Sequence, residues 1–141
     1  MRTAIPYLAL TLVPFAAGPA TTSSAPGAAL DGSRWNLSAL SGVTVSADSH
    51  ASLEFAHGRV QGSDGCNHYS GRYRARDGQF QAGPDLISTQ MACPAPIMQR
   101  ASAYVQVLLA ARGYRADTTE LRLLGPNGAE LAIFSAVAPA R

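Results

Sequence analysis

The chain of 141 residues contains no lysine, and all eleven of its basic residues are arginine. We attribute this bias to GC-rich codon usage and give it no functional weight. The arginines are scattered, and the sequence has no dense basic patch of the kind that contacts many phosphates, which argues against nucleic-acid binding. Arg72, Arg74 and Arg76 alternate along one expected strand, and we predict that they form a solvated face.

No apolar run is long enough to predict a transmembrane segment. The run Ala4–Ala17 contains Pro6 and Pro14 and falls short of the roughly 20 apolar residues that cross a bilayer. A short positive start before it and small residues after it predict a signal peptide over residues 1–20. A flexible lead-in over residues 21–30 follows. No cysteine lies near the cleavage region, so we expect a periplasmic or secreted protein without a lipid anchor.

Cysteine is also scarce, with Cys66 and Cys93 as the only two. Two cysteines in one small exported domain usually pair, and such a bond would stabilise the fold by roughly 3 to 4 kcal/mol. The alternative is two buried thiols. A redox-active pair is not expected, because no Cys-x-x-Cys spacing is present to lower a thiol pKa. We predict the disulfide.

Metal-ligand clusters and nucleophile motifs are missing too. Asp64, Cys66 and His68 alternate, so on a straight strand they would share a face, as in a metal site or a Cys–His pair. A structural metal needs about four ligands, and no second cluster exists. Ser63 lacks the flanking glycines of a nucleophile elbow. We therefore predict no catalytic residue, no metal and no cofactor, and keep a hydrolase that uses Ser63, Asp64 and His68 as an alternative.

The chain does contain alternating apolar segments separated by glycine turns. With the leader set aside, one domain is expected over residues 31–136, with a tail over residues 137–141. A turn dipeptide that ends in glycine between alternating runs predicts a β-hairpin. Three hairpins are expected: Leu53–Phe55 with Val60 around His57-Gly58, Tyr69–Ala75 with Gln79–Ala82 around Asp77-Gly78, and Glu120–Leu124 with Glu130–Phe134 around Asn127-Gly128.

One segment changes period. Apolar residues spaced three and four apart over residues 97–112 predict an amphipathic helix. Pro94 or Pro96 suits its first turn, Gly113 suits a left-handed stop, and Arg112 lies beside the negative helix end. We expect the apolar stripe of this helix to cover the open face of the sheet.

Two blocks carry a family pattern. The first is Gly65-Cys66-Asn67-x-Tyr69-x-Gly71, and the second is Thr89-x-Met91-x-Cys93. With these blocks, the chain resembles the META domain family, which includes the bacterial HslJ-like envelope proteins, over roughly Ser33 to Phe134. We expect Asn67 to bond backbone groups in a bend, and Gly62, Gly65 and Gly71, in and just before the first block, to mark bulges or tight curvature.

The resemblance and the hairpins imply the same fold class, mainly β (α+β). We expect a curled antiparallel sheet or half-barrel of six or more strands, with one short helix over about residues 97–112 packed on it. HslJ-like proteins are associated with the cell envelope, stress and novobiocin resistance, and no catalytic residue is established for the domain. The resemblance implies little about activity, and we expect a non-catalytic monomer that binds an envelope protein or a small apolar ligand, or supports envelope integrity under stress. An inhibitor or partner of an exported hydrolase is the alternative, and exposed, rigid residues near Asp85–Gln90 would favour it.

Overall fold

The computed structural model describes residues 30–46 and 48–137, together with Pro14, Ala16 and Gly18. The predicted signal peptide lies almost entirely outside the described residues, as does most of the lead-in and the tail. None of the described helices is long and apolar enough to cross a membrane. The described elements are β1 (Arg34–Leu40), β2 (Ser52–Ala56), β3 (Arg59–Ser63), β4 (His68–Arg76), β5 (Gln79–Ala82), β6 (Ile87–Ser88), α1 (Ala95–Ala110), β7 (Gly113–Ala116), β8 (Glu120–Leu124) and β9 (Glu130–Ala136).

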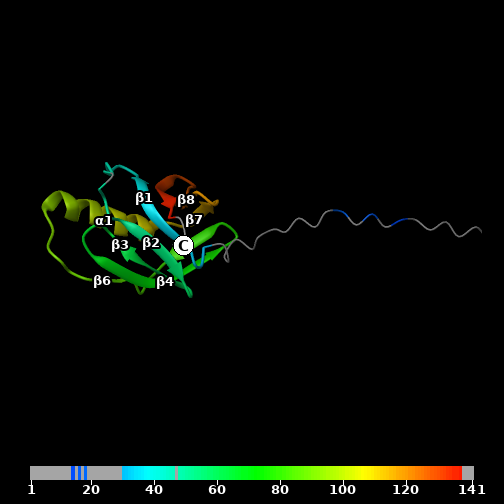
Figure 1. Cartoon of the computed structure of the whole chain (residues 1–141), viewed down its shortest axis with the longest axis horizontal. Coiled ribbons are helices and arrows are strands. Elements are labelled where there is room, and N and C mark those ends of the chain that lie inside the picture. Colours follow the sequence, from blue (N-terminus) through cyan, green and yellow to red (C-terminus); the bar gives the residue numbers. More distant parts are fainter. Residues whose placement is uncertain (1–13, 15, 17, 19–29, 47, 138–141) are drawn as a thin grey trace, which may run out of the picture.

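Antiparallel pairing closes the sheet into a barrel (Figure 1). The strands follow the order β3-β2-β1-β9-β8-β7-β5-β4, and β4 pairs again with β3, while β6 pairs with β4 outside this ring. The mainly β class is confirmed. The expected curled antiparallel sheet or half-barrel of six or more strands is close to this structure, but the eight strands of the ring form a closed barrel rather than an open one.

Strand β7, which no hairpin signal predicted, completes the ring. It holds one buried residue, Tyr114, so its four residues carry too little alternation to predict a strand. β7 meets β5 at a single residue pair, Gln79 with Gly113. The amide of Phe80 reinforces the seam by donating to the carbonyl of Arg112 at 3.0 Å. This seam is the shortest pairing in the ring.

All three predicted hairpins are present. Phe55 pairs with Val60, Ala75 with Phe80, and Leu121 with Phe134. In the first two turns both central residues have positive φ, as a tight two-residue turn requires. The third turn is longer: the Gly125 amide bonds to the carbonyl of Ala129, and the register shifts beside Leu124.

Helix α1 begins and ends two residues earlier than predicted. Pro94 is its N-cap, and Pro96 lies in its first turn. Gly113 is not the left-handed stop, because the chain becomes extended at Ala111 and Gly113 already belongs to β7. Arg112 does lie at the helix end, where its Nη1 donates to the carbonyl oxygens of Leu109 and Ala111, each at 2.8 Å.

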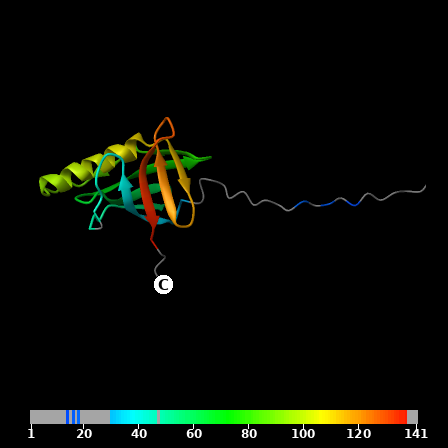
Figure 2. The same cartoon turned by 90° about the horizontal axis from the view of Figure 1, so that it is seen from above.

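The helix packs along one side of the barrel, next to the strands drawn in green (Figure 2). It buries Ala101, Tyr104 and Leu108. The Tyr104 ring reaches the barrel interior, where its centroid lies 6.1 Å from that of Phe134. Aromatic and aliphatic side chains fill this interior, and Phe55 and Phe134 are fully buried in it.

Leu30 and Asp31, which precede β1, are fixed to the barrel. Leu30 is fully buried. Asp31 accepts hydrogen bonds from the amides of His57 and Gly58 and from the hydroxyl of Tyr73. The Gly58 amide, followed by the Tyr73 and His57 contacts, holds the pKa of Asp31 below its usual value against a smaller opposing effect of burial. The folded core therefore already includes Leu30, and Asp31 bonds the segment before β1 to the turn between β2 and β3.

Candidate functional site

The two cysteines connect the β3–β4 loop to the start of α1. Their sulfur atoms lie at bonding distance, 2.19 Å, and their Cα atoms are 6.1 Å apart. This geometry agrees with the predicted disulfide. Cys93 precedes the helix and Cys66 lies between two strands of the ring, so the bond joins the helix to the barrel wall.

Asp64 organises the β3–β4 loop from inside. Its side chain is the one charged side chain buried within the described residues, and its residue is 5 % exposed. Its Oδ1 accepts the amides of Cys66 at 2.8 Å and Asn67 at 2.6 Å. Ser63 Oγ accepts the amide of Gly65, which has positive φ. Asp64 and Ser63 therefore bond the backbone of their own loop.

Asn67 links the two sequence blocks. Its Oδ1 accepts the Met91 amide at 2.6 Å and the Thr89 hydroxyl at 3.1 Å, and Thr89 Oγ1 in turn accepts the amide of His68. Asn67 thus bonds a backbone group, as predicted. That group belongs to a segment more than twenty residues away and not to the bend around Asn67 itself. We call Asp64, Cys66, Asn67, Thr89, Met91 and Cys93, which these bonds join, the motif network.

Gly62 and Gly71 are required because another segment packs closely against them, and not because they form bulges. A Cβ at Gly62 would overlap the carbonyl group of Ser52 on β2. A Cβ at Gly71 would lie 2.9 Å from Leu86 Cδ1 and 3.0 Å from Leu86 Cα. Both strands therefore need glycine where another segment approaches closely. Only Gly65, with φ +99, serves the turn itself.

Because Gly62 has no side chain, the hydroxyl groups of two buried tyrosines fit beside the carbonyl of Ser52. The hydroxyls of Tyr69 and Tyr104 lie 2.6 Å apart, and each lies within 3.0 Å of the Ser52 carbonyl oxygen. Two hydroxyl protons can make only two of these three contacts, so one hydroxyl donates to the carbonyl and the other donates to its neighbour. Burial raises the pKa of both tyrosines well above the usual value. The pair fixes α1 to β2 and β4.

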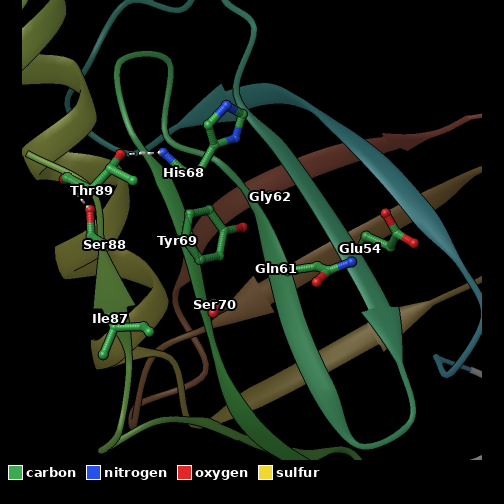
Figure 3. A pocket seen from close by; sticks show the side chains of 9 residues that line it. All are labelled: Glu54, Gln61, Gly62, His68, Tyr69, Ser70, Ile87, Ser88 and Thr89. Carbon is green, nitrogen blue, oxygen red and sulfur yellow. Dashed lines mark hydrogen bonds between the residues drawn. The ribbon is translucent and has the colours of Figure 1, made fainter. Parts of the chain in front are cut away.

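A groove of about 550 Å³ lies beside the motif network (Figure 3). Ile87, Ser88 and Thr89 line one side of it, and Gln61 and Glu54 lie on the other. It is lined by Glu54, Gln61, Gly62, His68, Tyr69, Ser70, Ile87, Ser88 and Thr89. Seven of these nine residues carry a polar side-chain group, and Ile87, 68 % exposed, is the large exposed apolar side chain of the groove.

Ser63, Asp64 and His68, the residues of the hydrolase alternative, are neighbours but are not joined as a catalytic set. Ser63 and His68 face each other in the β3–β4 register. Within the part of the chain that the structure describes, no hydrogen bond involves the His68 imidazole, which is exposed. Asp64 bonds loop amides and Cys66 is joined to Cys93. The serine–histidine contact and the orienting carboxylate that nucleophilic catalysis uses are not formed here.

The segment beyond β5 is exposed and anchored at several points. Of the residues from Asp85 to Gln90, only Leu86 is half-buried and the others are exposed. Asp85 Oδ1 accepts the amide of Arg72, and the amide of Thr89 donates to the carbonyl of His68. Exposed and anchored residues in this segment are the feature that favours the alternative of an inhibitor or partner of an exported hydrolase.

The comparisons with known proteins agree with this architecture. The family model described as META domain matches residues 28–138. A solved NMR structure of a protein from Burkholderia xenovorans is 28% identical, with a TM-score of 0.64, and the match covers 99% of this chain and 100% of that one. A second NMR structure is 20% identical, with a TM-score of 0.61 over 77% of this chain and 92% of that one, and is similar in fold. No protein of curated function matches the chain.

Proposed function

This chain belongs to the META domain family, and from that premise we propose that it is a non-catalytic domain of the cell envelope that acts by binding another envelope protein. One observation carries the proposal. Ser63 and Asp64, two of the residues that the hydrolase alternative would use, accept amides of the β3–β4 loop, and the neighbouring Cys66 is joined to Cys93. The disulfide and the apolar leader favour an exported location.

The groove and the exposed segment beside it form the proposed contact surface. Ile87 supplies an apolar contact, and His68, Gln61 and Ser70 supply polar groups around it. The motif network holds this surface rigid, because Thr89 and Met91 are bonded to Asn67. A rigid surface loses little conformational entropy when a partner binds, which favours affinity.

A second candidate is an inhibitor of an exported hydrolase. It is favoured by one specific feature, the exposed and anchored residues from Asp85 to Gln90. Such a segment suits insertion into a cleft, as rigid inhibitor loops do. Both candidates use the same surface and differ only in the partner.

Complementation of a strain that lacks the gene, read as growth under novobiocin, tests the binding proposal. Ile87→Glu places a charge on the contact surface and should abolish complementation at normal protein level. Ser63→Ala and His68→Ala should retain most of it. Loss of function in Ser63→Ala, with a folded product and with Ile87→Glu still active, would support the hydrolase instead. Ser135→Glu, on the exposed part of β9, is the matched control.

A photocrosslinking amino acid at Ile87 separates the two binding candidates. An adduct with a non-hydrolytic envelope protein supports the first candidate. An adduct with a hydrolase, whose activity falls when purified chain is added, supports the second. No adduct at Ile87, or equal adducts at Ile87 and Ser135, contradicts both.

A further inference from the structure

A second surface, on the outside of β3, β4 and β5, gathers positive charge. Arg72, Arg74 and Arg76 are exposed on β4, and Arg59 lies on β3 directly opposite Arg72. Like charges in direct register destabilise a sheet, so the fold itself gains nothing from this pair. We call Arg59, Arg72, Arg74, Arg76, Gln79 and Gln81 the arginine face.

Glutamine amides complete the donor set of this face. Gln81 is the cross-strand partner of Arg74, and Gln79 is the partner of Arg76. Guanidinium and amide groups that point outward from adjacent strands suit oxyanions, and arginine binds phosphate oxygens in a bidentate manner. Successive outward residues on a strand are about 7 Å apart, so neighbouring arginines can contact separate phosphate groups.

Two hollows overlap on the arginine face. The first, about 500 Å³, includes Arg72 and Asp85, and the second, about 610 Å³, includes Arg76 and Arg112. Arg74 and Gln81 line both. Each hollow has the volume of a small-molecule site. Arg74 is therefore the central cation of a continuous surface.

The carboxylates of this region neutralise the face only at its ends. Asp85 Oδ2 lies 3.6 Å from Arg72 Nε, and Asp77 Oδ2 lies 3.5 Å from Arg76 Nε. Among the described residues, no ion pair involves Arg59 or Arg74. On β8, by contrast, Arg122 pairs with both Glu120 and Glu130.

Arg112 adds a fixed cation to the second hollow. Its Nη1 donates to two carbonyl oxygens at the end of α1, which holds the guanidinium in place. Its own backbone joins the barrel seam, because its amide donates to Leu124 and its carbonyl accepts from Phe80. A ligand that contacts Arg74 and Arg112 together would connect β4 with the segment that closes the barrel.

We propose that the arginine face binds a ligand that carries two phosphate groups, with Arg74 and Gln81 at the centre and Arg112 at one end. This site is separate from the groove beside Ile87, so it does not depend on the proposed function. A soluble diphosphate and a phosphorylated lipid headgroup share this chemistry. Charge complementarity selects this ligand class, because two small hollows with several guanidinium groups suit compact anions rather than apolar molecules.

Titration of the full exported chain with sodium pyrophosphate tests the proposal, read by calorimetry and by the NMR signals of arginine Nε–H groups. We expect saturable binding that shifts the Arg74 signal and weakens as salt screens the charges. Arg74→Ala should weaken the affinity roughly tenfold or more, since it removes charged hydrogen bonds. Arg115→Ala, which removes another exposed arginine from outside both hollows, should leave it unchanged.

Absence of saturable binding, or equal losses in Arg74→Ala and Arg115→Ala, overturns the proposal. Unfolding temperatures without pyrophosphate show whether both variants fold, and Gln81→Ala provides a second, uncharged probe of the same position. Vesicles with and without an anionic phospholipid distinguish the ligand's source. Arg74-dependent capture that pyrophosphate competes identifies a lipid headgroup. Binding of pyrophosphate without vesicle capture identifies a soluble phosphate ligand.

Discussion

The motif network lies in the β3–β4 loop and in the segment between β6 and α1, whereas the arginine face lies on β3, β4 and β5, and the two regions use their polar groups in opposite ways. In the motif network, Asp64 and Asn67 each accept two hydrogen bonds from within the chain. On the arginine face, like charges stand opposite each other and Arg74 points outward between two hollows. A region whose polar groups are satisfied internally stabilises the fold, whereas one that leaves donors available is suited to a ligand. The residues that identify the family therefore hold the structure.

Among substitutions in the two regions, removal of the disulfide should cause the largest loss in the free energy of unfolding. Cys66→Ser with Cys93→Ser should lower the free energy of unfolding by about 3 to 4 kcal/mol, because the unfolded chain regains the entropy of an open loop. Urea denaturation measures this loss. A change of less than about 1 kcal/mol would mean that the bond adds little to the other contacts of the motif network.

Asp64 comes next. Asp64→Ala leaves the partly buried amides of Cys66 and Asn67 without an acceptor and should cost about 2 kcal/mol. Asp64→Asn keeps an oxygen at this position and serves as the matched control, with a smaller loss expected. Equal losses in the two variants would show that the negative charge, rather than the two hydrogen bonds, is what the loop requires.

Alkaline pH tests the buried tyrosines beside the motif network. The pKa values of Tyr69 and Tyr104 are raised in the folded state, so their contribution to stability is complete below the usual pKa of about 10. It should fall as pH rises above that value, by up to about 1.4 kcal/mol per pH unit for each tyrosine. Urea midpoints between about pH 9 and pH 11 measure the slope, and Tyr104→Phe should flatten it. An unchanged slope in Tyr104→Phe would contradict the buried-pair account.

The smallest effect is expected on the arginine face. Arg59→Gln removes a like charge opposite Arg72 and should raise the free energy of unfolding by a few tenths of a kcal/mol. Arg115→Gln, on β7, is a control for general loss of positive charge. Thermal unfolding at low salt measures both variants. A clear loss of stability in Arg59→Gln would show that this arginine stabilises the fold. It would contradict the claim that the arginine face contributes little to stability.

Local sequence rules predicted much of the fold. Glycine turns located the three hairpins, and apolar spacing located the helix to within two residues at each end. Barrel closure was not predictable in this way, because β7 carries a single buried residue and pairs with β5 at one position. The stop at Gly113 failed for the same reason, since the tertiary seam recruits that residue into a strand.

The candidate sites likewise include features that local sequence predicts and features that only the tertiary structure reveals. The disulfide could be predicted because the chain has few cysteines and an expected exported location. The hydrogen bond between Asn67 and Met91 joins two distant loops, and no local pattern predicts it. The arginines look scattered along the chain. Only pairing of β3 with β4, and the position of α1, bring Arg59 and Arg112 to the same side as Arg74. Charge clustering here is a property of the tertiary fold.

The central claim is that structure and binding are divided between the two regions, and one paired measurement tests it most directly. Urea denaturation and pyrophosphate titration are performed on Asn67→Ala and Arg74→Ala. Asn67→Ala should lower the free energy of unfolding by about 2 kcal/mol and bind pyrophosphate with wild-type affinity. Arg74→Ala should change stability by less than about 0.5 kcal/mol and bind roughly tenfold more weakly. Wild-type pyrophosphate affinity in Arg74→Ala, or weakened affinity in a folded Asn67→Ala, would contradict the account.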